Sequence, residues 1–237
     1  MPTDDPSALD AAAALARVPW LAASSGQARA LLLRHASVRR YDRQQAVFRR
    51  GDALDQLWIV IEGRLEMSIV DADGRRFVAA QVPPGEAVGF IPLVDRRGAI
   101  HDARALMPTA LLRLPRESFL AALQVDVDLL QAVLRLLLER GRRLNEWRAE
   151  VTMRPLAARL ARLLAGLAQA FGTAGSDAAV SLAISQDDLA AMVGVTRQAL
   201  NPEIKALERA GLVYLAYKRV HLRDLDGLRK LASEAGA

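Results

Sequence analysis

Between residues 38 and 114 the chain alternates short apolar runs with turn signals. The runs, such as residues 57–61 and 65–70, are rich in β-branched and aromatic side chains. Strands that recur about every 8–12 residues, with glycine turns between them, are typical of a β-sandwich or β-barrel. The pattern therefore predicts an all-β domain, in which the Asp-Gly pair at Gly74 forms the tip of a hairpin over residues 70–77.

Helical spacing replaces this pattern on both sides of the β-rich segment. Residues 7–17, where Ser7 and Asp10 are spaced like a capping box, predict one short helix, and residues 26–34 predict another. From residue 116 onward apolar residues recur at steps of three and four, and only Gly141 interrupts the run from 129 to 151. We therefore expect a helix roughly 30 Å long there.

This long helix carries apolar residues on more than one face. A small β-domain covers only one face of a helix, so a second copy of the helix is the expected partner of the other face. The alternative is a helix that is buried entirely within its own chain.

Two further elements lead into the C-terminal region. Pro155 marks either a kink or the first turn of a new helix, and an amphipathic pattern then predicts a helix over residues 156–171 that Gly172 ends. A small, polar loop follows over residues 172–178, and residues 180–184 alternate like a short strand.

The most specific segment begins with a helix and a tight turn. Ser185 is expected to cap a helix over residues 186–192, in which Leu189 and Met192 face inward. Gly194 follows, where a turn between two helices needs a glycine.

A second helix is expected over residues 197–209, capped by Thr196 and closed by Gly211. On this pattern its inward side chains are Ala199, Leu200, Ile204 and Leu207. Residues 213–215 and 220–222 then form the two strands of a wing. Helix, glycine turn, capped helix and wing together predict a winged helix-turn-helix.

The second helix also carries side chains suited to DNA. Arg197, Gln198 and Asn201 lie in its first turns. Arginine pairs with O6 and N7 of guanine, and glutamine or asparagine pairs with N6 and N7 of adenine. The backbone N–H groups that follow Thr196 suit a phosphate. Three further basic residues are expected to neutralise phosphates without selecting a sequence: Lys205, Lys218 and Arg219.

Pro202 leaves an alternative open. It removes the N–H that would bond the carbonyl of Gln198, and it disfavours helical geometry at Asn201. The helix therefore either kinks there, which would re-aim Asn201, or is shorter than the pattern suggests. The alternative to DNA binding is a domain of this kind that makes only protein contacts, with solvated charges.

Composition limits the chemistry available to the chain. The 237 residues carry a net charge of +5, a mildly basic balance that is compatible with nucleic acid. Cysteine is absent, which excludes disulfides, cysteine-ligated zinc, iron–sulfur clusters and thiolate catalysis. Metalloenzymes on β-roll folds place two histidines and a carboxylate close together, whereas His35, His101 and His221 are far apart. Since neither a nucleophile elbow nor a P-loop occurs, we expect no enzyme activity.

The first residues and the length of the apolar runs indicate in which compartment the protein is expected. Residues 1–6 are acidic where a signal peptide would be basic, and no apolar run approaches the roughly 18 residues of a membrane span. We expect a cytoplasmic protein with no membrane partner.

Four motifs match a known pattern. Those of the β-rich half are VFRRGD at residues 47–52, DQLWIVIEG at 55–63 and PGEAVG at 84–89, and that of the C-terminal half is QDDLAAMVGVTRQ at 186–198. In these motifs the chain resembles the cyclic-AMP receptor and fumarate–nitrate regulator (CRP/FNR) family of bacterial transcription factors, over roughly residues 25–225. The resemblance implies an α+β fold with an N-terminal double-stranded β-roll, a long dimerisation helix and a C-terminal winged helix-turn-helix.

The resemblance also implies an organisation and a set of partners. The expected segments are an N-terminal helical arm (1–24), a β-roll sensor (25–120), a dimerisation helix (121–150) and a DNA-binding domain (151–237). The implied assembly is a homodimer that binds two-fold symmetric operators in double-stranded DNA, with its two recognition helices in successive major grooves. RNA polymerase is a further candidate partner. The alternative is a degenerate family member that acts through protein contacts alone.

The family's cyclic-nucleotide signature is altered in this chain. Where cyclic-nucleotide binders have a Gly-Glu pair for the ribose, this chain has Gly89-Phe90, and where they have Arg-Ser or Arg-Thr for the cyclic phosphate, it has Ala99-Ile100. On the long helix, Leu144-Asn145 replaces a polar pair that would meet the base. A phosphate buried here would lack its counter-charge, so we expect no binding of cyclic AMP or cyclic GMP.

What remains is an apolar pocket for an unknown small-molecule effector, or no effector at all. The candidate pocket residues are Gly89, Phe90, Ile91, Arg96, Arg97, Ile100, His101, Leu144 and Asn145. Arg96 and Arg97 are either ligands for a different anion or solvated loop charges. His101 is either a haem or metal ligand, as in some sensors of the family, or simply a packed or exposed residue of a β-segment. We expect no haem, no metal and no other cofactor.

Overall fold

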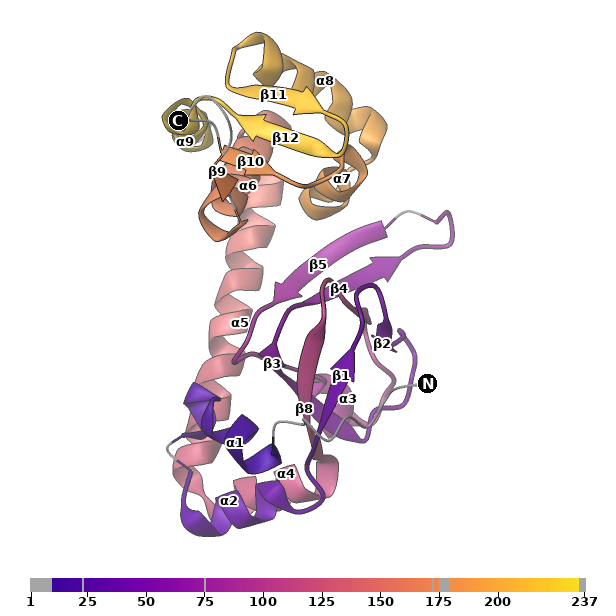
Figure 1. Ribbon diagram of the computed structural model, residues 1–237, viewed down its shortest axis with the longest axis vertical. Coiled ribbons are helices and arrows are strands. Elements are labelled where there is room, and N and C mark those ends of the chain that lie inside the picture. The colour runs from indigo at the N-terminus through magenta and orange to yellow at the C-terminus, as the bar shows by residue number, and fades with distance from the viewer. Residues whose placement is uncertain (1–9, 23, 75, 172, 175–179, 235–237) are drawn as a thin grey trace. The chain divides into compact units, whose positions relative to one another are not determined.

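The computed structural model describes residues 10–22, 24–74, 76–171, 173–174 and 180–234 (Figure 1). The contacts within it divide the chain into two compact units. Unit 1 comprises residues 1–69 and 78–140, and unit 2 comprises residues 70–77 and 141–237. Each unit has a hydrophobic core of its own.

Unit 1 is built around two sheets. Within the described residues, one has the strand order β1-β8-β3-β6 and the other β2-β7-β4-β5. The strands are β1 Ser37–Tyr41, β2 Ala46–Phe48, β3 Gln56–Glu62, β4 Leu65–Val70, β5 Arg76–Val82, β6 Ala87–Val88, β7 Asp102–Ala105 and β8 Thr109–Pro115. Antiparallel pairing joins β1 to β8, β3 to β8 and β4 to β7. The predicted β-rich domain is confirmed, with one short helix, α3, inserted in it.

The uninterrupted apolar run of β3 is explained by burial on both faces. Leu57, Ile59 and Ile61 belong to a core that the sheet shares with helices. Trp58 and Val60 point the other way, into a core between the two sheets. Because β3 and its neighbour β8 are buried on both sides, they serve packing, and binding groups have to be sought at turns and on helices.

The helices of unit 1 cover the first of these cores. They are α1 Ala11–Ala16, the 3-10 helix η1 Pro19–Leu21, α2 Gly26–Leu33, α3 Phe90–Asp95, α4 Arg116–Val125 and α5 Val127–Met153, which continues into unit 2. The predicted helices 7–17 and 26–34 are confirmed with shorter bounds. The side chain of Asp10 caps α1 by accepting the Ala12 N–H at 3.3 Å, and Ser7 lies outside the described residues.

Asp126 separates α4 from α5. Its carboxylate accepts the N–H of Leu129, in the first turn of α5, at 2.9 Å, and the N–H of Ser25, which precedes α2, at 2.7 Å. These hydrogen bonds hold the pKa of the Asp126 carboxyl below its usual value, because they favour the charged form. One carboxylate thus defines the start of α5 and joins it to α2.

Unit 2 packs helices against a small sheet. Its elements are α6 Leu156–Phe171, β9 Thr173–Ala174, β10 Val180–Leu182, α7 Gln186–Val193, α8 Arg197–Arg209, β11 Val213–Ala216, β12 Arg219–Leu222 and α9 Leu225–Glu234. The predicted bounds of α6 and α8 are confirmed. The wing is not an isolated hairpin, because in the described residues β11 and β12 continue into the sheet order β11-β12-β10-β9.

Two sequence-based predictions for unit 2 need correction. The loop predicted over residues 172–178 contains the strand β9, and its residues 172 and 175–178 lie outside the described part of the chain. A last helix, α9, is missing from the prediction. It begins where the Asp224 carboxylate accepts the Gly227 N–H at 2.8 Å, and it buries Leu228 in the core of the unit.

None of the helices in the described ranges is both long enough and apolar enough to cross a membrane.

Candidate nucleic-acid interface

Side-chain caps define the turn between α7 and α8. Oγ of Ser185 accepts the N–H of Asp188 at 3.1 Å, and Oγ1 of Thr196 accepts the N–H of Ala199 at 3.2 Å. Between the two helices Gly194 adopts a φ of +79°, a backbone conformation that is strained for any residue with a side chain. The predictions for Ser185, Gly194 and Thr196 are confirmed, and together they fix the angle at which α8 leaves the turn.

One side of α8 is buried and the other is exposed. Leu200, Ile204 and Leu207 lie in the core of unit 2. The prediction that Ala199 also faces inward is wrong, because it lies about 100° around the helix from Leu200 and is exposed. Of the residues predicted to contact DNA from this helix, one is half-buried, Asn201, and four are exposed: Thr196, Arg197, Gln198 and Lys205.

Pro202 does not end α8. The helix runs from Arg197 to Arg209 with the proline inside it, so the shorter-helix alternative is wrong. Because proline has no N–H, residue 202 leaves the carbonyl of Gln198 without its usual helical partner. An interior proline costs on the order of 3 kcal/mol relative to alanine, and the burial of the apolar side of α8 has to offset that cost.

The wing presents basic side chains at its tip. Ala216 pairs with Arg219, so Tyr217 and Lys218 form the turn between β11 and β12. Both turn residues are exposed, and the Lys218 ammonium lies 5.4 Å from the centre of the Tyr217 ring. Arg219 is exposed as well and donates from Nη1 to Oγ of Ser181 at 3.4 Å. The tip can therefore place two cations against an anionic partner.

Arg197 contacts the helix that precedes it. Its Nη1 lies 3.2 Å from Oδ2 of Asp187, which is in the first turn of α7. Asp187 is absent from the residues that the sequence singles out. The only local signal for it is an acidic side chain at a helix N-terminus, which is common because it suits the helix dipole.

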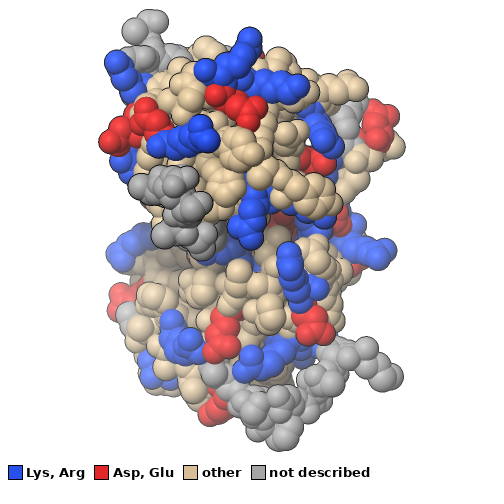
Figure 2. Space-filling view, turned by 45° about the horizontal axis from the view of Figure 1, so that its top comes forward, with Lys and Arg blue, Asp and Glu red and all other residues tan. Residues whose placement is uncertain are grey.

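Positive charge is prominent on the surface of the molecule. Figure 2 shows side chains of both signs on the face that it presents, with Lys and Arg more abundant than Asp and Glu. This agrees with the net charge of +5 and favours long-range attraction to phosphates.

Two domain families match the chain. Residues 38–126 match the cyclic nucleotide-binding domain, and residues 158–231 match the Crp-like helix-turn-helix domain. The chain is 32% identical over 186 residues to the HTH-type transcriptional regulator Cmr of Mycobacterium tuberculosis, a match that covers 78% of this chain and 72% of that protein. The chain belongs to the CRP/FNR family.

Further relatives support this membership. The chain is 25% identical over 193 residues to the CRP-like cAMP-activated global transcriptional regulator of Mycobacterium tuberculosis, over 81% of this chain and 86% of that protein. A crystal structure of a CRP/FNR-family transcriptional regulator from Thermus thermophilus aligns with a TM-score of 0.70 and 27% identity, over 84% of this chain and 100% of that one. This CRP/FNR-family chain is thus a DNA-binding transcription regulator.

The candidate effector residues of this CRP/FNR-family protein are scattered. Gly89 starts α3 with a φ of +100°, and Phe90 is buried. His101 is half-buried, and four others in unit 1 are exposed: Ile91, Arg96, Arg97 and Ile100. Leu144 and Asn145 are exposed on α5 and fall in unit 2.

Phe90 is packed by the protein's own side chains. Its ring centre lies 6.2 Å from that of Trp20 and 6.0 Å from that of Phe119. The Arg140 guanidinium lies 5.5 Å from the Phe90 ring centre, and its Nη2 donates to the Ala87 carbonyl at 2.6 Å and to a Glu86 oxygen at 3.2 Å. Phe90 is thus part of the hydrophobic core of unit 1.

His101 lies near two charged side chains, Arg50 and Asp102. Burial lowers the pKa of its imidazole, and so does the positive charge of Arg50, while Asp102 acts in the opposite direction. The ring is therefore neutral near pH 7. In the part of the chain that the structure describes, no group of three His, Asp or Glu side chains could hold a metal ion.

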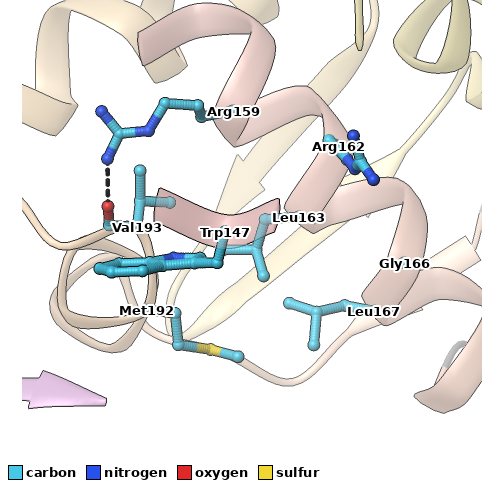
Figure 3. Close-up of a pocket in the computed structure, with 8 residues that line it drawn as sticks. All are labelled: Trp147, Arg159, Arg162, Leu163, Gly166, Leu167, Met192 and Val193. Carbon is cyan, nitrogen blue, oxygen red and sulfur yellow. Dashed lines mark hydrogen bonds between the residues drawn. The ribbon is translucent and has the colours of Figure 1, made fainter. Parts of the chain in front are cut away.

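Unit 2 also contains an apolar cavity of about 300 Å³ (Figure 3). Trp147 of α5, Leu163 and Leu167 of α6, and Met192 of α7 line it, and Arg159 at its edge donates to the carbonyl of Val193. The lining residues include no nucleophile and no acid–base pair.

Proposed function

We propose that the chain is a homodimeric, sequence-specific regulator that binds two-fold symmetric operators in double-stranded DNA. The observation that carries the proposal is the division of α8, whose apolar side lies in the core while its first turn exposes Arg197 and Gln198 behind the Thr196 cap. A helix that is held from one side and presents such groups on the other suits the major groove.

The residues of this surface divide into two roles. Arg197, Gln198 and Asn201 contact base edges, because their donors and acceptors match those of guanine and adenine. The backbone N–H groups after Thr196 hold a phosphate. Phosphate contacts that set the register come from Lys205, Lys218 and Arg219.

Dimerisation rests on the three faces of α5. Leu129 and Val133 are buried in the core of unit 1. About 100° around the helix lies an exposed apolar stripe, and the remaining face is polar. The stripe consists of Leu130, Leu134, Leu137, Leu138 and Leu144, which are 38–66% exposed. Leucines at this spacing suit a second copy of α5 in a coiled-coil contact, so the chain is a dimer with two copies of α8.

The signal that acts on unit 1 is not cyclic AMP. One relative is a cAMP-activated regulator, but here Phe90 is buried between Trp20 and Phe119, and no carboxylate is available at that position for a ribose. Calorimetry with cyclic AMP should give no binding, and micromolar affinity would contradict this part of the proposal. The protein acts in the cytoplasm, needs no haem or metal, and catalyses no reaction.

A selection on genomic DNA tests the proposed function. Purified protein is incubated with sheared genomic DNA at near-physiological salt, with the small-molecule fraction of a cell extract added, and the retained fragments are sequenced. The expected result is an enriched two-fold symmetric motif whose half-sites lie about one helical turn apart. Salt-sensitive binding with no enriched motif would favour a family member that acts through protein contacts.

Sedimentation tests the dimer. Leu138→Glu places a charge in the exposed apolar stripe and should convert a dimer to a monomer. Arg135→Glu is the matched control, since Arg135 is on the polar face of α5, where it donates to Gln131 at 3.2 Å. A monomeric wild-type chain, or two variants that sediment alike, would contradict the assignment.

A further inference from the structure

Asp187 is an acidic residue within reach of the recognition helix. Its Oδ2 lies 3.2 Å from Nη1 of Arg197, and the two side chains are 64% and 62% exposed. The pair joins the first turn of α7 to the first residue of α8, and both helices have side-chain caps, Ser185 and Thr196. The backbones that carry the pair are therefore well defined, although the pair itself is exposed to solvent.

The guanidinium has donors to spare for this contact. Arginine carries five N–H donors in a planar fork, and a contact to O6 and N7 of guanine uses two of them. Asp187 accepts from Nη1, which leaves the edge formed by Nε and Nη2 for a base. A long, exposed side chain otherwise populates many rotamers, so a fixed partner reduces the entropy lost when it binds.

The same carboxylate is unfavourable for DNA binding in general. A negative charge beside the recognition helix repels phosphates, and it does so whatever the base sequence. An acidic side chain at this place therefore lowers affinity for all DNA and raises the selectivity of the arginine that it orients.

We propose that Asp187 is a positioning residue for sequence recognition: it orients Arg197 toward its base pair at the expense of non-specific affinity. This inference rests on the proposed function, since it requires that Arg197 contacts a base. It predicts that removing one negative charge weakens discrimination while strengthening binding to unrelated DNA.

The test compares Asp187→Asn with wild type on the selected operator and on a scrambled duplex, by fluorescence anisotropy. The ratio of the two affinities should fall about fivefold, which corresponds to roughly 1 kcal/mol. Affinity for the scrambled duplex should rise about twofold, the size expected for one exposed charge. Asp187→Glu, which keeps a carboxylate, should retain most of the discrimination.

Two controls separate positioning from other roles. Asp226→Asn removes a comparable exposed partner, since Asp226 lies 2.9 Å from Arg229 in α9, and it should leave discrimination unchanged. In an Arg197→Ala background, Asp187→Asn should still raise non-specific affinity but should no longer affect discrimination. The melting temperature of each variant shows that the domain is folded.

Several results would overturn the proposed role of Asp187. Unchanged discrimination in Asp187→Asn, or an equal loss in the Arg197→Ala background, would overturn it. Increased discrimination would also overturn it, because the pair would then restrain Arg197 rather than orient it. If wild type itself does not distinguish operator from scrambled duplex, the proposed function fails and the inference fails with it.

Discussion

The two units of the chain differ in how their candidate binding residues are exposed. In unit 2, α8 exposes Arg197 and Gln198 over a buried apolar side. In unit 1, the first residue of α3 is a buried phenylalanine, Phe90, with an arginine of α5 against its ring. Exposed hydrogen-bonding groups can bind a partner, whereas a buried ring mainly stabilises the fold. Unit 2 thus presents exposed polar groups at its candidate site, whereas the candidate position in unit 1 is part of the hydrophobic core.

The largest effect is expected at Phe90. If this position is core, Phe90→Ala should lower the stability of unit 1 by about 3–5 kcal/mol, because a large ring is removed from a packed site. Denaturant unfolding followed by tryptophan fluorescence measures it, and cyclic AMP should still not bind to the variant. A loss of stability below about 1 kcal/mol would contradict the assignment of Phe90 to the packed core.

At Pro202 we expect a substitution to raise the stability of unit 2, whereas Phe90→Ala lowers the stability of unit 1. Pro202→Ala restores an N–H beneath the carbonyl of Gln198 and should stabilise unit 2 by up to about 3 kcal/mol. Calorimetric melting measures the gain, and the exposed side of α8 is otherwise unaltered. A lower melting temperature would show that the local backbone depends on the proline.

At Arg197 we expect the reverse of Phe90: a substitution should weaken DNA binding and leave stability unchanged. Arg197→Ala should weaken operator binding by about 1–3 kcal/mol and relax sequence preference, without lowering the melting temperature. Lys218→Ala is the control for a phosphate contact: it should weaken binding to all sequences alike and reduce the salt slope by about 1. If Arg197→Ala alters neither affinity nor preference, the assignment of base contacts to α8 is wrong.

The smallest effect concerns acid stability in unit 1. The pKa of Asp126 in the folded chain is lowered, so its contribution to stability is present above its usual pKa and is lost as pH falls through the lowered value. Asp126→Asn should therefore lower the melting temperature at neutral pH and flatten its dependence on pH in the acid range. A variant whose melting curve parallels that of wild type at every pH would contradict this role.

Elements with local signals could be predicted from sequence. Ser185, Gly194 and Thr196 act within three or four residues of themselves, so the helix-turn-helix follows from spacing alone. The inserted helix α3 could not be found in this way, because six residues with a proline among them give no helical period. The helix α9 could have been found from its leucines and from Asp224 as a cap.

The sequence could predict those residues of the candidate site whose exposure follows from one element alone, but not the contacts between elements. The exposed basic residues of α8 and the wing are found from the helical period and the turn. The partner of Arg197 is ten residues away on another helix, and Arg140 is 50 residues from Phe90. Such contacts depend on how the elements pack, which spacing within one element does not reveal. The exposure of Ala199 could not be predicted either, because it depends on how much of the surface of α8 packs against the core.

The contrast between the units is tested most directly by one titration. Wild-type protein is titrated into labelled operator and into scrambled duplex, with and without cyclic AMP, in the presence of the small-molecule fraction that was used in the selection, and binding is followed by fluorescence anisotropy. We expect tighter binding to the operator in both conditions, with an affinity that cyclic AMP leaves unchanged. Equal affinity for the two duplexes, or a preference that appears only with cyclic AMP, would contradict it.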